Sequence, residues 1–374
     1  MTWLDWLTVG PASIPLALNL LNARWWPRGT AVAPPSGPVS VLIPARDEEA
    51  NIEAAVTAAL ALDPPAHEVI VCDDGSTDQT PAILARLAAR DPRLRVIGAP
   101  PLPEGWVGKP HACHVLGEAA SGALLLFVDA DVRLAPDALG RVEHLLQRFH
   151  GRVLTAFPGQ ALGTWAERLL VPLLPLTFTS WMPLDLVHAH TNPAFLVVNG
   201  QILAFRREAY EAVGGFASVR AEIVDDMAIC RRAKEHDQRV VFADGQDLGT
   251  CRMYRGGAEV WRGFSKNLYE GLGGRPLALL AVLAVYGTAF VLPYGRLLSD
   301  LATGAPAGVA LVGVGLNLAT RAHLARRLHH GVVSVLLHPL AVLALLAMAI
   351  NSARWVHADA IAWRGRTYGR RTAR

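Results

Sequence analysis

Several signatures of common enzyme and metal-binding classes are missing from this chain. No apolar run is followed by GxGxxG or GxxxxGK[ST], which argues against dinucleotide oxidoreductases and P-loop enzymes. No pattern of basic and aromatic residues typical of nucleic-acid binding occurs either. The four cysteines lack CxxC spacing, so they indicate no zinc site and fit a reducing compartment: Cys72, Cys113, Cys230 and Cys251.

Charge is also scarce, at 18% of the 374 residues, whereas hydrophobic residues make up 52% and the mean hydropathy is +0.28. This composition is too apolar for an ordinary soluble enzyme, so we expect part of the chain to lie in lipid. The apolar residues concentrate near the two ends, in segments whose lengths run from marginal to sufficient for a membrane span: Leu4–Leu21, Leu277–Leu298, Ala305–Thr320 and Val332–Ile350.

The first apolar segment predicts an N-terminal membrane anchor within residues 1–30. It lacks a basic start and contains Asp5, which argues against a cleaved signal peptide, and an interfacial helix is the alternative. Arg24 and Arg28 follow it, which favours an outside N-terminus and a multi-pass protein of the inner membrane with a cytoplasmic catalytic domain. Residues 31–38, AVAPPSGP, predict a Pro-rich linker.

The C-terminal segments, at 275–353, are expected to be transmembrane helices, but their orientation conflicts with the charges. Arg321–Arg327 and the basic tail at 354–374 both favour the inner face, which three simple crossings cannot satisfy. Either one apolar run, such as Ala305–Thr320, is re-entrant or interfacial, or the positive-inside rule is broken here.

An apolar run that ends in acids is the most informative feature within the chain. Leu124–Arg133, LLLFVDADVR, predicts a buried strand that delivers Asp129 and Asp131 at its end, side by side on one face. Unpaired charges are costly to bury, so a cation is expected between them, and carboxylate oxygens suit Mg²⁺ or Mn²⁺. An ordinary Asx-type turn is the alternative for this pair alone.

Two more apolar runs upstream end in polar residues. Val69–Cys72 is followed by Asp73 and Asp74, and Val39–Ile43 is followed by the sequence PARDEE. Strands that alternate with helices form βαβ units, whose ligands gather beyond the carboxyl ends of the strands, so these acids are expected to converge on one crevice. The helical patterns that follow the strands cover three ranges: Asn51–Leu62, Thr80–Ala89 and His111–Ala120.

Five motifs in order resemble the signatures of family 2 inverting glycosyltransferases: PARDEEANI, VIVCDDGSTDQT, GWVGKPHA, LLLFVDADV and EIVDDMAIC. The resemblance covers Val39 to Gly274 and is closest to membrane-bound members such as the carotenoid-acid and hopanoid-associated glycosyltransferases. It implies an α/β chain with a GT-A catalytic domain at 39–274, Rossmann-like with a mostly parallel sheet. Membrane-embedded helices are then expected at the N- and C-terminal ends.

The resemblance also implies roles on the donor side. Asp131 is expected to contact the metal, and Asp129 to contact the ribose or support the metal. Asp74 is expected to hydrogen-bond the nucleobase beside Asp73, although an Asx turn and a helix cap would explain the same stretch. In the family, the loop that lines the nucleotide pocket corresponds to three residues here, of which the last differs from other members: Pro44, Ala45 and Arg46.

Two more basic residues are candidates for the diphosphate. Lys109 in GWVGK could reach it, against the alternative of a solvated loop lysine. Arg262 matches the arginine of the Gln-x-x-Arg-Trp helix of many relatives, although Glu259 and Gly263 replace the Gln and Trp of that motif. Arg262 is therefore expected to clamp the diphosphate, unless it belongs to an interfacial Trp-Arg helix.

The proton acceptor is expected in the segment EIVDDM. Family members carry two acids here, of which the second is the base, so the resemblance assigns Asp226 as base and Asp225 as a supporting carboxylate. An acidic first turn of a helix at Asp226–Glu235 is the alternative. The apolar stretch 162–198 predicts interfacial helices that form an entry path for the acceptor, and an insertion buried in the core is the alternative.

These expectations predict a metal-assisted hexosyltransferase that moves a sugar from a UDP- or GDP-sugar to a carotenoid, hopanoid, sterol-like or other lipid acceptor, with no nucleic-acid partner. Two alternatives stay open. One is a polyprenyl-phosphate sugar or polysaccharide synthase of the same family. The other is a catalytically inactive membrane scaffold.

Overall fold

The computed structural model describes residues 2–358, 360–363 and 366–368, so much of the predicted basic tail lies outside the described residues. The chain forms two compact units. The first, here named the apolar unit, comprises three segments: Met1–Trp25, Leu162–Pro183 and Tyr254–Ile361. The second, here named the α/β unit, comprises the others: Trp26–Ala161, Leu184–Met253 and Ala362–Arg374. These units differ from the predicted domains, in which residues 39–274 form a single catalytic domain, and the predicted boundaries stay predictions.

The α/β unit is built on an eight-stranded sheet with the order β3-β2-β1-β4-β7-β6-β8-β5. The pairs β3-β2, β2-β1, β1-β4 and β6-β8 are parallel, whereas β4-β7, β7-β6 and β8-β5 are antiparallel, so the sheet is mixed. The strands have the following bounds: β1 Val39–Ala45, β2 Glu68–Asp73, β3 Leu94–Gly98, β4 Leu124–Val128, β5 Val132–Leu134, β6 Val153–Gln160, β7 Ile202–Arg206 and β8 Val240–Cys251. A separate two-stranded pair closes the described chain: β9 Ile361–Trp363 and β10 Arg366–Tyr368.

Helices cover both faces of this sheet, because alternate strand residues face opposite sides. In β1, Val41 and Ile43 pack into one buried cluster with α2 and α5, whereas Leu42 packs into another with α4 and α10. The predicted strands β1 and β2 and the three predicted helices are confirmed within three residues at their ends, whereas β4 ends earlier than expected. The bounds of the helices are α2 Ile52–Leu60, α3 Thr80–Ala88, α4 Gly108–Ala119, α5 Ala138–Arg148, α8 Leu184–Ala189, α9 Arg207–Ala212, η1 Phe216–Val219 and α10 Asp225–Glu235.

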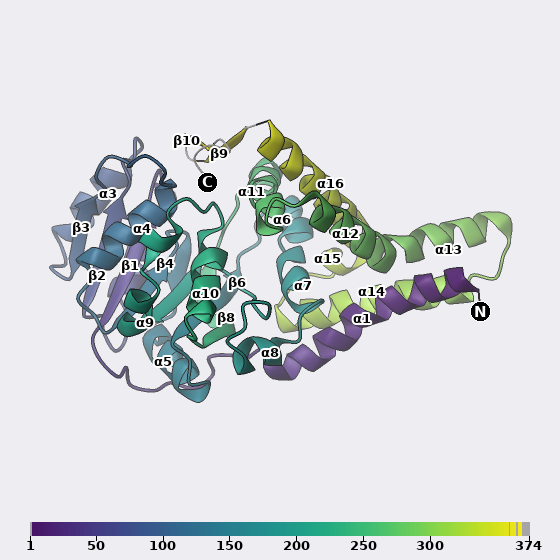
Figure 1. Ribbon diagram of the computed structural model, residues 1–374, viewed down its shortest axis with the longest axis horizontal. Helices are drawn as coiled ribbons and strands as arrows, with labels where there is room; N and C mark the ends of the chain where they lie inside the picture. Colours follow the sequence, from purple (N-terminus) through teal and green to yellow (C-terminus); the bar gives the residue numbers. More distant parts are fainter. Residues whose placement is uncertain (1, 359, 364–365, 369–374) are drawn as a thin grey trace. The chain divides into compact units, whose positions relative to one another are not determined.

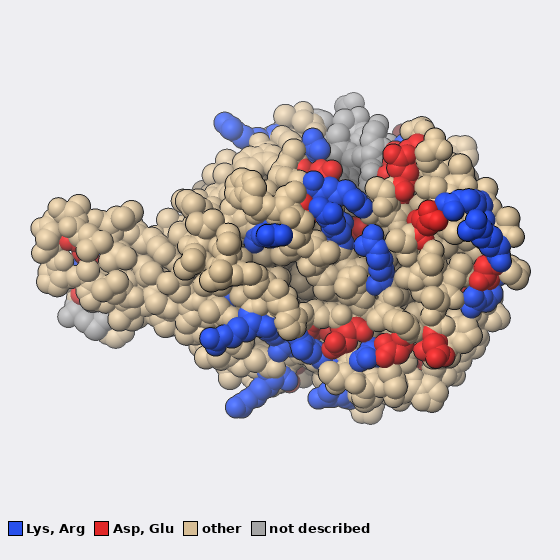
Figure 2. Space-filling model, turned by 180° about the vertical axis from the view of Figure 1, so that it is seen from behind, with Lys and Arg blue, Asp and Glu red and all other residues tan. Residues whose placement is uncertain are grey.

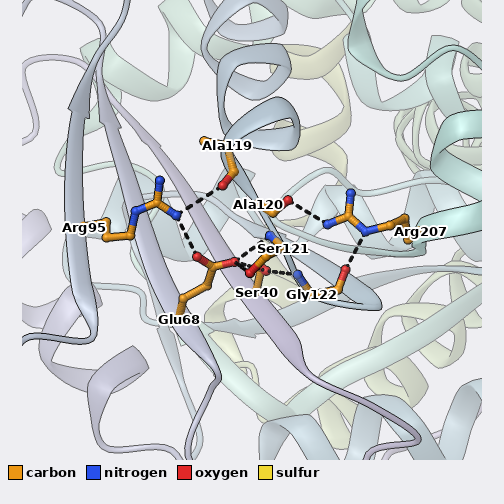
Figure 3. Close-up of polar contacts among 8 residues, drawn as sticks. All are labelled: Ser40, Glu68, Arg95, Ala119, Ala120, Ser121, Gly122 and Arg207. Carbon is orange, nitrogen blue, oxygen red and sulfur yellow. Dashed lines mark hydrogen bonds and ion pairs between the residues drawn. The ribbon is translucent and has the colours of Figure 1, made fainter.

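A buried carboxylate ties the strand starts together, at the opposite ends from those that carry the acidic loops (Figure 3). Glu68 accepts hydrogen bonds from Ser40 Oγ, from the backbone N and Oγ of Ser121, and from Arg95 Nη1 at 2.8 Å. Burial works against its charge, but these donors outweigh burial and lower the pKa of Glu68 to about 2. The first residues of β1 and β2 and the loop before β4 are thereby held in register.

The apolar unit contains four helices long and apolar enough to cross a membrane: α1 Trp3–Trp25, the continuous α12-η2-α13 at Pro276–Thr303, α14 Gly308–Arg327 and α16 His338–His357. Each of the four predicted apolar segments overlaps one of these helices. The remaining elements are short or amphipathic: α6 Trp165–Leu170, α7 Leu173–Thr179, α11 Gly257–Gly271 and α15 Val333–Leu336. Figure 2 shows one end of this unit, at the left, as a surface with few charged side chains.

Polar contacts fix the packing inside the apolar unit. Helices α1 and α14 run side by side (Figure 1), and Arg327 Nη1 donates to the carbonyl of Ala23, so the basic ends of both helices lie together. Asn22 Nδ2 donates to the carbonyls of Thr179 and Met182, both at 2.8 Å. The stretch predicted as interfacial helices is indeed broken, since α6 and α7 belong to the apolar unit and α8 to the α/β unit.

Candidate active site

The loops after β1 and β2 form one wall of the candidate site. Ala45 pairs with Asp73 across the two strands, and the backbone N of Asp74 donates to the carbonyl of Ala45 at 2.9 Å. Arg46 Nη1 donates to the carbonyl of Asp74 and lies 4.0 Å from its Oδ2. Pro44 is opposite Cys72 in the same register. The predicted nucleotide-binding residues of these two loops are therefore brought together.

Within this wall the two aspartates differ. Asp73 Oδ1 accepts hydrogen bonds from the backbone N and the Oγ of Ser76, at 3.0 and 2.6 Å, so its side chain closes the loop locally, as the alternative reading of this stretch allows. Asp74 is 5% exposed, and its Oδ2 lies 4.0 Å from Arg46 Nη1 on the neighbouring loop. The fold uses Asp73 to shape the loop, and Asp74 stays the candidate for the nucleobase.

The acidic pair after β4 lies on a turn and not on the strand itself. The strand was expected to carry both aspartates at its end, but β4 ends at Val128, and the backbone N of Val132 donates to the carbonyl of Asp129 at 3.0 Å. This turn leads directly into β5, which pairs with β8. The alternation argument therefore does not apply to these two aspartates, and their proximity comes from the turn.

Lys109 joins the acidic pair to the second half of the site. It stands in the first turn of α4, and its Nζ lies 2.6 Å from Asp129 Oδ1. Burial lowers the pKa of Lys109, but the carboxylates of Asp129 and Asp225 reverse this and raise it well above its ordinary value. Lys109 is therefore a charged ammonium in α4 that is paired with Asp129, and its contact with the diphosphate stays a prediction.

Asp226 lies in the first turn of α10, next to Gly200, which shortly precedes β7. Burial raises its pKa, the charge of Lys109 opposes that rise, and the charge of Asp129 adds to it. Gly200 is required beside it, because a Cβ at this position would lie 2.8 Å from Asp226 Oδ2. A carboxylate with a raised pKa near Lys109 and Asp129 has the properties of a general base.

Asp131 has one satisfied and one unsatisfied oxygen. Its carboxylate accepts a hydrogen bond from the thiol of Cys251, whereas Oδ1 is buried and has no hydrogen-bond partner. Burial, followed by repulsion from Asp129 and Glu48, raises the pKa of Asp131 to about 7. A buried oxygen without a partner in an acidic cluster is the feature expected of a cation ligand.

A chain of hydrogen bonds leads through Gln160, Gln201 and Cys251 to the carboxylate of Asp131. Gln160 Nε2 donates to Gln201 Oε1 at 3.1 Å, and Gln201 Nε2 donates to Cys251 Sγ at 2.7 Å. Burial raises the pKa of the Cys251 thiol well above its ordinary value. The thiol therefore stays protonated and donates a hydrogen bond to Asp131. The chain fixes the direction of the carboxylate, as partners of metal ligands commonly do.

These residues fit a hard divalent cation. Among the described residues no three His, Cys, Asp or Glu side chains are grouped as a complete metal cage. Mg²⁺ and Mn²⁺ sites that hold phosphates commonly use one or two carboxylates and take their other ligands from the substrate and water. Asp131, with Asp129 beside it, matches this incomplete type of site.

One predicted site residue belongs to the apolar unit, and the structure adds other residues to the site in the α/β unit. Arg262 lies on the exposed side of α11 in the apolar unit, so its diphosphate role stays a prediction. The sequence did not reveal Gly200, Gln201 and Cys251 as site residues. Their only signal was that Gly200 and Gln201 precede β7, since Cys251 lies about 50 residues further along the chain.

The sequence comparisons agree with one another. Residues 40–214 match the family described as Glycosyl transferase family 2. Beta-monoglucosyldiacylglycerol synthase of Synechocystis sp. is 30% identical over 259 residues, which cover 64% of this chain and 50% of that protein. The 4,4'-diaponeurosporenoate glycosyltransferase of Staphylococcus haemolyticus is 24% identical over 239 residues, which cover 62% of this chain and 61% of that protein. The chain thus spans about half the length of the first relative.

A solved structure shows the same architecture. The mannosyltransferase PcManGT from Pyrobaculum calidifontis, in complex with GDP-Man and Mn²⁺, aligns with a TM-score of 0.57 at 19% identity. The alignment covers 93% of this chain and 98% of that chain. At this level of identity the likeness concerns the fold alone, which is the GT-A fold predicted from the sequence.

Proposed function

We propose that this chain, which contains a family 2 glycosyltransferase domain of the GT-A fold, transfers a sugar from a nucleotide sugar to a lipid-type acceptor at a membrane. The observation that carries the proposal is the position of Lys109. Its ammonium pairs with Asp129 of the acidic turn and interacts with the acids that begin α10. Lys109 thereby links Asp129, proposed for the donor side, with Asp226, proposed as the base.

On the donor side, the loop residues Asp74 and Arg46 bind the nucleoside, and Asp129 and Asp131 face the diphosphate. A divalent cation held there supplies a Lewis acid for the leaving diphosphate. Lys109 holds Asp129 in place before the donor binds, and it offers a second positive charge next to the diphosphate oxygens.

On the acceptor side, Asp226 takes the proton of the acceptor hydroxyl or carboxyl group as that oxygen attacks the anomeric carbon. The bond from the anomeric carbon to the diphosphate oxygen breaks as the new bond forms, so the configuration inverts. Burial makes Asp226 more basic than an exposed aspartate, which suits proton abstraction. Asp225, 6% exposed and one residue away, supports the charge of Lys109.

A lipid-type acceptor is supported by two independent observations. The relatives are named for a glucosyldiacylglycerol and for diaponeurosporenoate, both lipid-type molecules. The chain itself has four helices apolar enough to cross a membrane. An acceptor confined to the bilayer explains why such helices accompany an α/β catalytic unit.

We further propose that the α/β unit faces the cytoplasm. Arg327 of α14 bonds to Ala23 of α1, so Arg24 and Arg326 mark the same end of both helices. Basic residues prefer the cytoplasmic side of a membrane, and the chain enters the α/β unit directly after α1. A cysteine-labelling assay on intact cells, with single cysteines introduced near either helix end, would test this orientation.

The function is tested by lipid mass spectrometry of cells with and without the protein. A lipid that carries a hexose only in the presence of the protein would name the acceptor, and incubation of the purified protein with UDP-glucose or GDP-mannose would name the donor. Asp226→Asn should abolish the product, whereas Asp185→Asn, on the exposed side of α8, should not. Equal lipid profiles in all strains would exclude the proposal.

A further inference from the structure

In a buried arginine of the apolar unit, two of the three guanidinium nitrogens make no hydrogen bond to the described residues. Arg321, in the last two turns of α14, is fully buried. Its Nη1 donates to the carbonyl of Pro172 at 2.8 Å. Within the described chain, its Nε and Nη2 are buried and have no hydrogen-bond partner.

The two unused nitrogens are chemically informative. Nε and Nη2 form one edge of the guanidinium, and this edge donates two parallel hydrogen bonds to a carboxylate or a phosphate. No acidic side chain among the described residues acts on this charge. An arginine buried without a counter-charge is costly, and in membrane segments such residues mark functional sites.

Two imidazoles surround the same charge. His330 and His338 both interact electrostatically with Arg321, and His338 is fully buried. Neither ring nitrogen of His338 has a partner among the described residues, nor has Nδ1 of His330. His338 is also the first residue of the 20-residue helix α16, whose N-terminus favours negative charge. We name Arg321, His330 and His338 the Arg321 cluster.

The chain between the two histidines is apolar and exposed. Val332, Val333 and Leu336, in and beside α15, are 66%, 46% and 64% exposed. A small inorganic anion would gain nothing from these side chains, whereas an alkyl chain would bury them. Apolar side chains beside a buried cation with free donors match a molecule with an anionic head and an apolar tail.

We propose that the Arg321 cluster binds the phosphate or carboxylate headgroup of a lipid, with the lipid tail against α15. The site is distinct from the donor site and goes beyond the transfer reaction, which requires no such anion. Because Arg321 is fully buried, binding requires the chain around it to rearrange locally. We therefore expect binding to be slow and saturable.

The test is a binding assay on the full-length protein in dodecyl maltoside, with ³²P-labelled dodecyl phosphate as the probe. Wild type should bind it saturably, and Arg321→Met should weaken binding about 10-fold or more, as expected for loss of charge-assisted bonds. Arg326→Met is the matched control, since it removes an exposed charge from the same helix and should leave the affinity within about twofold. Dodecanoate should compete, and inorganic phosphate should not.

The outcomes separate the sources of the anion. Competition by inorganic phosphate at the same concentration as dodecyl phosphate would overturn the lipid assignment. Absence of saturable binding to wild type would overturn the site, whatever the variants do. Arg321→Met should melt no lower than wild type, because it removes an unpaired buried charge. His338→Phe provides a second variant that retains the arginine and should also weaken binding.

Discussion

Lys109 Nζ lies 2.6 Å from Asp129 Oδ1, and this ion pair connects the acidic turn after β4 with the first turn of α4. The two side chains are 38% and 27% exposed, so the pair is screened only in part. Lys109→Met should therefore lower stability in the absence of metal by ~1 kcal/mol. The variant leaves Asp129 and Asp131 repelling each other, so MnCl₂ should raise its melting temperature more than that of wild type. Equal shifts in a thermal melt would contradict this role.

The thiol of Cys251 should control metal affinity without touching the metal. Cys251→Ala removes the hydrogen bond to Asp131, and partners of metal ligands typically contribute about 10- to 100-fold in affinity. Cys251→Ser should restore most of this, since a hydroxyl also donates. Mn²⁺ titration followed by electron paramagnetic resonance measures the affinity directly. Cys72→Ala, another buried thiol, is the control, and equal affinity of all variants would refute the role of Cys251.

Gly200 should be essential for the position of the base. A Cβ at Gly200 would lie 2.8 Å from Asp226 Oδ2, so Gly200→Ala should displace that carboxylate. We expect kcat to fall by about 10²-fold or more while the KM for the donor stays near that of wild type. Gly159→Ala is the matched control, because its added Cβ would make only ordinary contacts of 3.5 Å or more. A normal kcat for Gly200→Ala would contradict the placement of Asp226.

The stability of the protein should depend on Glu68 in acid. The pKa of Glu68 is lowered from 4.5 to about 2, so its stabilising contribution is complete above pH 4.5 and is lost as the pH falls towards 2. Wild type should lose melting temperature over this window more steeply than Glu68→Gln. Thermal melts of both proteins between pH 2 and 6 measure the difference. Parallel curves would show that the Glu68 network contributes nothing.

The first half of the fold could be predicted because its signals are local. Short apolar runs end in acids at β1, β2 and β4, and helical patterns follow β1 and β2 and precede β4, which is sufficient for a βαβ prediction. The fold class and the acidic loops are thereby set by residues close to one another in sequence. The end of β4 was placed too late because a backbone bond between Val132 and Asp129 makes the turn, and no side-chain pattern marks it.

The second half could not be predicted in the same way. The antiparallel pairing of β4 with β7 and of β5 with β8 joins distant segments whose own patterns do not select a partner. For the same reason the hydrogen bond from Cys251 to Asp131 could not be predicted from the spacing of these residues in the sequence. The tie between Lys109 and Asp129, 20 positions apart, likewise required the folded sheet to bring α4 beside the turn after β4.

The stereochemistry of transfer tests the central claim most directly. The purified protein, supplied with the α-linked nucleotide sugar and its lipid acceptor, should give a β-linked product by proton NMR, and Asp226→Asn should give none. A product of retained configuration, or β-linked product formed by Asp226→Asn at the wild-type rate, would contradict a single displacement driven by Asp226.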